Sequence, residues 1–504
     1  MNCTTVARSL HPLVRHRGRR ARGYDPPVTL RRKLAWVAVL YFAEGFPYGI
    51  AYDVWPVYFR LHGVSLREIG LMSLLFLPYT LKPAWAPFAD RVGSRQGWIA
   101  ACQVGLAALC LAMLGFDAAH PGAALWGILL AFTFLSATQD ISIDAYAVDV
   151  STPRDSGLIN GMRVSLYRGA LLFAGGVLLL LADRPTFGWT GVWILAACLC
   201  LASAVLAFAS PRVPREHAGR VVPAALDGTV APLKRFGPGQ AALLAAAGVL
   251  VAQAYRTDWQ GLWVTLAVIA GSFALVSFLS PEMLRWAFRR EMLPVVAFVL
   301  CFKIGDSMLG RMVKPFWVDR GMTPTEIGLF SSGIGMGLTI LGALAGGWFI
   351  QRRGVFSGLF WLGAAQLVSN FGYVVVAALD LPRGDASLLG LSFGPFQATL
   401  YAASAIESIC QGLGTAAFLS FLMNLCDRSH AATQYALLSA GFSLSRDLAG
   451  AFSGIGVEGL GYPIYFAITA ALALPGLALL PWVRRMIREQ GDPPAGNPAP
   501  ATLG

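Results

Sequence analysis

Long runs of apolar residues, separated by short polar segments, are the dominant pattern of this chain from Leu34 to Val483. Each run is about 20 residues long, which is the length that a helix needs to cross roughly 30 Å of hydrocarbon. The runs are continuous and do not alternate between apolar and polar residues, so they favour membrane-spanning helices over the strands of a barrel. The pattern therefore predicts an all-α polytopic membrane protein.

Twelve of the predicted helices fall into two sets of six. The first set covers 34–59, 66–88, 98–116, 123–149, 157–182 and 188–209. The second set covers 293–317, 323–350, 355–378, 394–426, 433–455 and 462–483. Two further apolar runs between the sets, at about 241–256 and 260–280, predict an extra two-helix hairpin. The predicted domains are a cytoplasmic Arg-rich tail (1–33), an N-terminal six-helix half (34–209), a central loop with the hairpin (210–292), a C-terminal six-helix half (293–483) and a cytoplasmic tail (484–504).

Composition and charge agree with a membrane protein and set its orientation. The chain is 56% hydrophobic and 13% charged, with a mean hydropathy of +0.60, which is not typical of a soluble domain. If the amino terminus is cytoplasmic, 26 of the 39 Lys and Arg residues lie on the cytoplasmic side, 6 on the opposite side and 7 inside helices. This distribution obeys the positive-inside rule, so we expect both termini in the cytoplasm. The net charge of +12 then needs no nucleic-acid partner.

A short segment recurs in the two halves. Gly63-Val-Ser-Leu-Arg-Glu-Ile-Gly-Leu-Met-Ser73 matches Gly321-Met-Thr-Pro-Thr-Glu-Ile-Gly-Leu-Phe-Ser331 at six of eleven positions. In each copy a Ser or Thr lies three residues before a Glu, which is the pattern of a capping box at a helix start. The eight cysteines lie mostly inside predicted helices without a C-x-x-C pair, which is typical of buried apolar residues and not of a metal or disulfide framework.

The repeat continues one helix later and resembles a known signature. Ala86-Pro-Phe-Ala-Asp90-Arg91-Val-Gly93 matches Gly347-Trp-Phe-Ile-Gln351-Arg352-Arg-Gly354. The first copy resembles the Gly-x-x-x-Asp-Arg-x-Gly-Arg signature of the major facilitator superfamily, with Ala86 in place of the first Gly. The resemblance implies a major facilitator fold, in which two parallel six-helix halves rock around a site near the midplane.

Several longer segments resemble the AmpG-type muropeptide permeases. They are Leu77-Pro-Tyr79-Thr80, Ser136-Ala-Thr-Gln139-Asp140, Tyr167-Arg168, Lys303-Ile-Gly305-Asp306, Gly412-Leu-Gly414 and Ala432-Thr-Gln-Tyr435. The resemblance implies proton-driven import of anhydro-muropeptides (GlcNAc-anhydroMurNAc peptides) across the bacterial inner membrane for cell-wall recycling, by a monomer without a cofactor. Importers of siderophores and transporters of acetyl-CoA share some of these motifs. The basic residues after Asp306, Arg311 and Lys314, leave another anionic solute as the alternative cargo.

Ionisable residues inside the predicted helices are the strongest indication of a site. A charge at the bilayer centre costs roughly 2.5–3.5 kcal/mol, so it normally faces a cavity or a partner. The acids are Glu44, Asp53, Asp140, Asp144, Asp306, Glu407 and Asp447. The bases are Lys82, Arg163, Arg168, Lys303, Arg311, Lys314 and Arg446. The equal numbers leave structural ion pairs as the alternative to function for each residue.

Depth along the helices assigns candidate roles. At 1.5 Å per residue, Glu44, Asp140, Arg168 and Lys303 lie about 15–17 Å from the cytoplasmic ends, with Asp306 slightly deeper. All six histidines fall in tails or loops, so a carboxylate must carry the proton, and the candidates are Asp140, Glu44 and Asp306. The candidates for substrate binding are Arg168, Lys303, Gln139, Tyr146, Tyr167 and Glu407.

A second group lies nearer the cytoplasm. By the same count Lys82, Asp144 and Arg163 each lie about 9 Å inside, so we expect them to form one cluster. Together with Asp90 and Arg91 they are the candidates for a cytoplasmic gate.

Enzymatic function finds little support in the sequence. There is no Gly-x-x-x-x-Gly-Lys loop for ATP and no His-Glu-x-x-His for a catalytic metal. A membrane-embedded transferase that uses Asp140 and Asp144 as acid and base remains an alternative, which the parallel repeat disfavours. We therefore predict a secondary transporter without a metal site.

Overall fold

The computed structural model describes residues 29–82, 85–86, 89, 93–150, 156–211, 249, 293–384, 386–425 and 431–491. Most of the predicted tail 1–33, the extra hairpin at 241–280 and the gate candidates Asp90 and Arg91 lie outside these residues.

Helices make up nearly all of the described chain, which confirms the predicted all-α class. In the N-terminal part they are α1 (Leu30–Gly49), η1 (Ile50–Val54), α2 (Trp55–Leu61), α3 (Leu66–Leu71), η2 (Met72–Phe76), α4 (Leu77–Leu81), α6 (Arg95–Ala112), η4 (Met113–Gly115), α7 (Ala123–Val150), α8 (Ser156–Leu172), η5 (Phe173–Leu178), α9 (Leu179–Ala182) and α10 (Gly188–Ala209). In the C-terminal part they are α15 (Leu293–Cys301), α16 (Ile304–Asp319), α17 (Pro324–Glu326), η6 (Ile327–Ile334), α18 (Gly335–Arg353), α19 (Val355–Ala378), α20 (Pro395–Leu425), α21 (Ala431–Ala471) and α22 (Leu474–Gly491). Within the described residues, 10 helical segments are long and apolar enough to cross a membrane.

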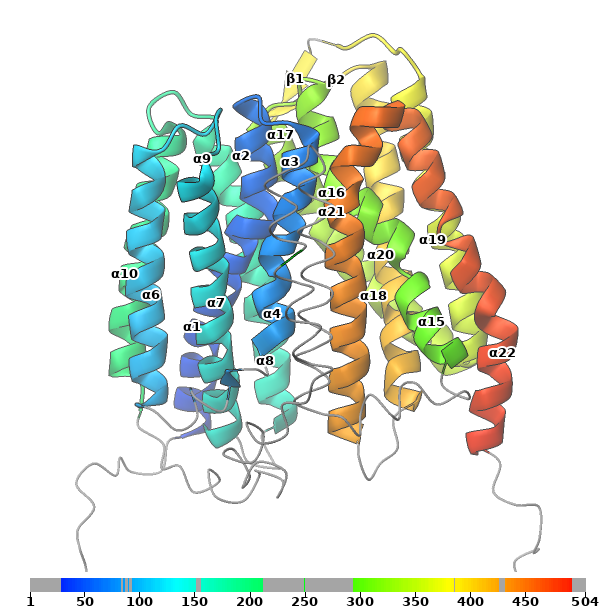
Figure 1. Ribbon diagram of the computed structural model, residues 1–504, viewed down its shortest axis with the longest axis horizontal. Coiled ribbons are helices and arrows are strands. Elements are labelled where there is room, and N and C mark those ends of the chain that lie inside the picture. The colour runs from blue at the N-terminus through cyan, green and yellow to red at the C-terminus, as the bar shows by residue number, and fades with distance from the viewer. Residues whose placement is uncertain are drawn as a thin grey trace, which may run out of the picture.

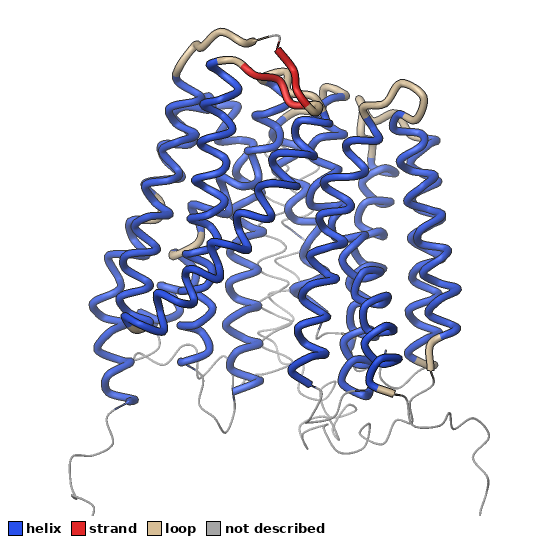
Figure 2. The backbone as a smooth tube through the Cα atoms, turned by 180° about the vertical axis from the view of Figure 1, so that it is seen from behind, coloured by secondary structure: helices blue, strands red, loops and turns tan. Residues whose placement is uncertain are grey.

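The helices run along one common direction as a bundle, and the early and late parts of the chain occupy opposite sides of it (Figure 1). We call residues 29–211 the N-half and residues 293–491 the C-half. Helix α1 begins and α22 ends at one end of the bundle, the terminal end. The opposite end, which we call the hairpin end, carries a small β hairpin (Figure 2). Helix packing joins the halves through α3 with α21 and α2 with α16.

Both copies of the repeated segment begin a helix as the sequence predicts. Ser65 accepts a hydrogen bond from the Glu68 N–H while the Glu68 side chain accepts one from the Ser65 N–H. Thr323 and Glu326 form the same reciprocal pair at the start of α17. Glu326 does more, because it also accepts hydrogen bonds from the Ser392 N–H and the Tyr401 hydroxyl.

Two of the predicted spans, 293–317 and 462–483, each contain a short interruption that the apolar runs did not predict. The first breaks between α15 and α16, where Lys303 has φ −109° and ψ 6°. The second breaks at 472–473, between α21 and α22. Pro475 explains the second break, since it has no N–H to continue the helix ladder and favours the first turn of a new helix. The breaks are adjacent, because a Cβ added at Gly476 would lie 2.7 Å from the Phe302 Cα.

The loop before α20 holds a β hairpin that the sequence analysis did not predict. Its strands are β1 (Ala386–Leu388) and β2 (Leu391–Phe393), paired antiparallel with Leu388 opposite Leu391. Leu389 and Gly390 connect the strands, and both have positive φ, 55° and 84°. Positive φ at both central residues is the geometry of a two-residue turn that matches strand twist. The Glu326 contact to Ser392 anchors this hairpin to the start of α17.

Candidate functional site

The N-half buries two carboxyl groups beside one lysine. Lys82, directly after α4, forms an ion pair with Asp140 of α7. Glu44 of α1 lies beside Asp140 and is only 8% exposed. One oxygen of each acid, Oε2 of Glu44 and Oδ1 of Asp140, has no hydrogen-bond partner among the described residues. The group has a net charge of −1 when both acids are ionised, and it is neutral when it holds one proton.

Asp144, one turn along α7, belongs to a different pair. It accepts hydrogen bonds from Arg163 of α8 at 2.5 Å and from the Tyr41 hydroxyl at 2.7 Å. The Arg163 guanidinium also lies 4.7 Å from the centre of the Tyr41 ring. The expected cluster of Lys82, Asp144 and Arg163 thus contains two ion pairs, Lys82 with Asp140 and Arg163 with Asp144, and Lys82 lies within electrostatic range of Asp144. The count of about 1.5 Å per residue gives the depth of each residue on its own helix, but it does not determine which carboxylate the Lys82 side chain reaches.

Gln139 is fully buried and holds three helices together. Its amide donates to the Ala43 carbonyl of α1 at 2.9 Å and accepts from Gln103 of α6 at 2.8 Å. Gln103 donates to the same Ala43 carbonyl at 3.0 Å. These contacts place Gln139 directly behind Glu44 and fix how α7 approaches α1. The residue is thus positioned to support the Glu44 and Asp140 pair, with its amide engaged by the protein.

The C-half has a corresponding group at the break between α15 and α16. The Lys303 ammonium donates to Asp306 Oδ2 at 3.0 Å and to Gln366 Oε1 of α19 at 2.7 Å. Asn370 donates to the other oxygen of Asp306 at 3.1 Å. Glu407 of α20 lies within electrostatic range of both Asp306 and Lys303. Here too, two carboxyl groups share one lysine.

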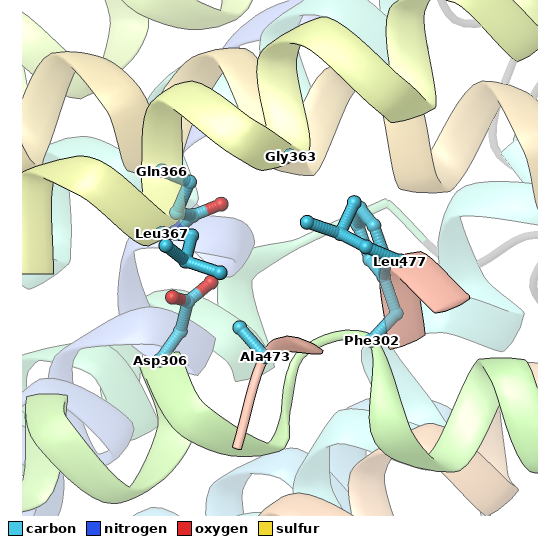
Figure 3. A pocket seen from close by; sticks show the side chains of 7 residues that line it. All are labelled: Phe302, Asp306, Gly363, Gln366, Leu367, Ala473 and Leu477. Carbon is cyan, nitrogen blue, oxygen red and sulfur yellow. The ribbon is translucent and has the colours of Figure 1, made fainter. Parts of the chain in front are cut away.

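A small cavity opens beside this C-half group (Figure 3). It measures about 10 Å³, which is close to the space that one water molecule needs. Asp306 and Gln366 line one side of it and Phe302 and Leu477 line the other. The Gln366 Nε2, on a side chain that is 3% exposed, has no hydrogen-bond partner among the described residues. The cavity thus combines a carboxylate, an unpartnered amide and the two helix breaks.

A cationic cluster lies between the halves and contains no residue that the sequence analysis chose as a candidate site residue. Arg311 of α16 and Arg446 of α21 both pair with Asp447, at 3.2 Å and 3.4 Å. Asp447 is fully buried, and the cluster carries a net charge of +1. The Arg311 guanidinium lies 5.0 Å and 4.7 Å from the ring centres of Tyr52 and Phe76 in the N-half. The cluster therefore bridges the two halves.

Tyrosine rings of the N-half surround this cationic cluster. Tyr48 packs on Tyr52, Tyr79 and Tyr167, with ring centres 5.9, 5.1 and 6.0 Å apart. The Tyr79 hydroxyl donates to Ser136 at 2.6 Å. Tyr167, a predicted substrate contact, is part of this aromatic group, whereas Tyr146 is 2% exposed and packs in a separate apolar cluster.

Arg168 differs from the other bases inside the helices. Among the described residues its polar contact is with the Met336 sulfur of the C-half, from Nη1 at 3.7 Å. It is partly buried, and within the described part of the chain it forms no ion pair. Lys82, Arg163, Lys303, Arg311, Lys314 and Arg446 all have a carboxylate partner. Arg168 is therefore the base best placed to contact a bound anion.

Ion pairs and close backbone contacts join the halves at the hairpin end. Asp53 of η1 pairs with Lys314 of α16, and both side chains are nearly buried. Nearer the surface, Asp319 pairs with Arg60 and accepts from the Tyr462 hydroxyl at 2.7 Å. These contacts connect the two halves and would have to break if the halves separated at this end.

The missed tyrosines have a signal in the sequence. Tyr41, Glu44, Tyr48 and Tyr52 are spaced by three, four and four residues, which places them on one face of a helix. Arg311 and Lys314 extend the helical stripe that begins at Lys303 in the same way. The spacing does not reveal which residues of the other half contact this helix face. Those contacts determine whether the face forms a site or a packing surface.

Comparisons with known proteins agree with this architecture. The family model described as Major Facilitator Superfamily matches residues 37–381. The anhydromuropeptide permease of Escherichia coli (strain K12) is 30% identical over 460 residues, which cover 88% of this chain and 78% of that protein. An uncharacterized protein of Haemophilus influenzae is 27% identical over 470 residues, covering 91% of this chain and 96% of the relative.

Solved structures of low sequence identity share the fold. The POT family transporter PepTSo aligns with a TM-score of 0.64 at 13% identity, covering 93% of this chain and 99% of that one. A bacterial homolog of the human lysosomal transporter Spinster aligns with a TM-score of 0.58 at 15% identity, covering 94% and 100%. A helical, multi-pass inner-membrane architecture with buried charges between its halves is what a transporter of this fold requires. The chain belongs to the Major Facilitator Superfamily and, within it, to the family of AmpG-like anhydromuropeptide permeases.

Proposed function

We propose that this transporter imports anhydro-muropeptides, GlcNAc-anhydroMurNAc peptides, together with protons, for cell-wall recycling. The substrate class rests on the similarity to the Escherichia coli anhydromuropeptide permease, which is 30% identical over an alignment that covers 88% of this chain. The observation that carries proton coupling is the buried group of Glu44, Asp140 and Lys82, in which two carboxyls share one cation. When this group takes up one proton, its net charge changes from −1 to zero. Burial makes the uncompensated negative charge unfavourable.

The proposed roles follow the contacts. Glu44 and Asp140 carry the proton, and the Asp306 group of the C-half contributes to coupling. The substrate lies between the halves, where Arg168 holds a carboxylate by charge-assisted hydrogen bonds and the Tyr48, Tyr79 and Tyr167 rings contact the sugars. Gln139 holds α7 against α1, Lys303 and Glu407 belong to the Asp306 group, and Tyr146 packs on α7 away from these contacts. Asp144 with Arg163 closes the cytoplasmic side of the N-half.

Orientation and mechanism are part of the proposal. With both termini cytoplasmic, the terminal end faces the cytoplasm and the hairpin end faces outward. The Asp53 to Lys314 pair and the Arg60 to Asp319 pair then close the outer side, and they separate when the halves rock to admit substrate. The protein acts as a monomer, without a metal or cofactor.

The test is uptake of a labelled anhydro-muropeptide by cells that lack their own permease. The expected result is accumulation that a protonophore abolishes and that Asp140→Asn eliminates without loss of the protein from the membrane. Competition by unlabelled muropeptide, a siderophore and acetyl-CoA identifies the cargo. If the cells accumulate a labelled siderophore or acetyl-CoA but not the labelled muropeptide, the fold carries a different anion and the muropeptide assignment is wrong.

A further inference from the structure

The charges inside the helices are equal in number, but they do not pair one to one. Among the described residues, two acids have no cationic partner of their own: Glu44, beside the Lys82 to Asp140 pair, and Glu407, beside the Lys303 to Asp306 pair. Two bases are in excess: Arg168, and one of the two arginines that share Asp447. Among the described residues, no ion pair joins Glu44 or Glu407 to Arg168 or Arg446, so the excess acids and the excess bases do not neutralise each other by contact.

Each excess acid lies close to a second carboxyl group; the N-half pair is buried, and the C-half pair is partly exposed. Glu44 faces Asp140, with Lys82, Asp144 and Tyr41 as the other ionisable neighbours. Glu407 faces Asp306, with Lys303, Tyr373 and Cys410 around it. The cavity beside Asp306 is also lined by Gln366, whose Nε2 has no hydrogen-bond partner among the described residues, so the C-half pair has a polar space of its own. Each half therefore holds one carboxyl pair that gains neutrality with one proton.

The excess bases lie where the two halves meet. Arg168 reaches from α8 toward Met336 of the C-half. Arg446 is partly accessible, with 28% of its side chain exposed, while Arg311 packs on the Tyr52 and Phe76 rings. When both carboxyl pairs hold a proton, these two cationic positions have no compensating charge left. An uncompensated cation in the membrane interior is unfavourable, so protonation favours the binding of anions here.

We propose that this transporter is electroneutral, and that two protons enter with a substrate that carries two negative charges. One proton goes to the Glu44 pair and one to the Glu407 pair, while one carboxylate of the substrate binds Arg168 and the other binds Arg446. The proposal rests on the proposed function and deepens it. The charges within the helices sum to zero in both forms of the protein. In the empty form both excess acids are ionised and balance the two excess bases. In the loaded form the two added protons balance the two carboxylates of the substrate. Forms that hold protons without substrate, or substrate without protons, bury net charge, which couples the two fluxes.

The experiment measures uptake by the purified full-length protein in proteoliposomes, with an alkaline interior and a membrane potential set by potassium and valinomycin. The first probe is a labelled GlcNAc-anhydroMurNAc dipeptide that ends in glutamate and has two carboxylates. The second is the same compound with one carboxylate amidated. For the wild type we expect pH-driven uptake of the first probe to be independent of the potential. The second probe enters with two protons but only one negative charge, so each transport event moves one net positive charge inward. An interior-negative potential of about 100 mV should therefore raise its accumulation about 50-fold.

Variants then test the residues. Glu407→Gln removes one proton, so the first probe should become inhibited by the interior-negative potential while the amidated probe becomes independent of it. Arg446→Gln should raise KM for the first probe and leave that of one of its two singly amidated isomers unchanged. Asp117→Asn, in an exposed loop at the hairpin end, is the matched control and should behave as wild type.

Each outcome decides between the proposals. If the wild type accumulates neither probe under a pH gradient, the proposed function itself fails. If it accumulates the two-carboxylate probe but uptake responds to the potential, the proposed function stands and electroneutral coupling is overturned. The wild-type measurement alone gives this answer, so it does not depend on whether the Glu407→Gln protein folds.

Discussion

The partner of Lys82 offers the most direct test of the site. The depth along each helix, estimated from the sequence, grouped Lys82 with Asp144. In the structure Lys82 forms its ion pair with Asp140, and Asp144 pairs with Arg163. Two double variants separate the possibilities. Exchanging the charges of the observed pair, Lys82→Asp with Asp140→Lys, keeps one cation and one anion in contact. Exchanging Lys82 with Asp144 instead leaves Asp140 beside a second carboxylate and places a lysine against Arg163.

The expected magnitude follows from burial. The Asp140 side chain is 9% exposed and that of Lys82 is 26% exposed. Removing one partner of a buried ion pair typically costs about 3–5 kcal/mol, because the other charge is left uncompensated. Lys82→Ala strands the more buried carboxylate, so we expect a loss of about 3 kcal/mol. Asp140→Asn leaves a lysine that water can reach, so we expect a loss of about 1 kcal/mol.

The assay combines thermal unfolding of the purified protein with uptake in cells. At roughly 1 °C per kcal/mol for a chain of 504 residues, Lys82→Ala should lower the unfolding midpoint by about 3 °C. A double replacement by apolar residues, Lys82→Met with Asp140→Leu, should restore much of the midpoint, since a packed apolar pair can replace a buried ion pair. It should not restore uptake, because no group is left to exchange a proton with Glu44. Stability and transport are thereby separated.

The interaction energy of the observed pair is the decisive quantity. In double-mutant cycles, Lys82→Ala and Asp140→Ala should couple by about 1–3 kcal/mol, whereas Lys82→Ala and Asp144→Ala should be nearly additive. Partial recovery of uptake is expected from the Lys82 and Asp140 exchange alone. Rescue by the Lys82 and Asp144 exchange, with none from the observed pair, would refute the assignment.

Three further predictions concern packing and gating. Gly414→Ala should lower the unfolding midpoint by a few °C and impair uptake, because the added methyl group would collide with the Gln366 Oε1 that accepts from Lys303. Gly441→Ala is the control, since the space around its Cβ is open. Asp53→Asn should weaken the contact between the halves at the hairpin end, because it removes the charge that pairs with Lys314. An impermeant thiol reagent should then label a cysteine introduced near Lys314 faster. Unchanged labelling would exclude a role for the Asp53 to Lys314 pair in closure. Ser65→Ala and Thr323→Ala should each cost about 1 kcal/mol in unfolding free energy with uptake retained, and a loss of uptake without destabilisation would contradict a purely capping role.

Helix breaks show where local sequence was insufficient. The run 293–317 is apolar enough to predict one helix, and nothing in the residues around Phe302 and Lys303 requires an interruption. The break exists because Gly476 of the neighbouring chain segment packs against the Phe302 backbone and the Lys303 ammonium finds Asp306 and Gln366. Pro475, by contrast, is a local signal for the second break that the hydropathy pattern concealed.

Hydropathy, capping and charge distribution were sufficient for the class of protein, the approximate helices and the repeated helix starts at Ser65 and Thr323. These features depend on local chemistry: the length of apolar runs, and side chains within four residues of the groups they satisfy. The apolar runs also identified most of the ionisable residues that lie within the long apolar helices. Which of them pair was decided by the tertiary structure, because an ion pair depends on side-chain direction and on the rise of two different helices. Lys82 reaches Asp140 across α4 and α7, and Arg311 meets Tyr52 across the two halves, while Arg168 has no carboxylate partner among the described residues. Only the packed structure therefore separates the charges that hold the helices together from those that remain available for protons and substrate.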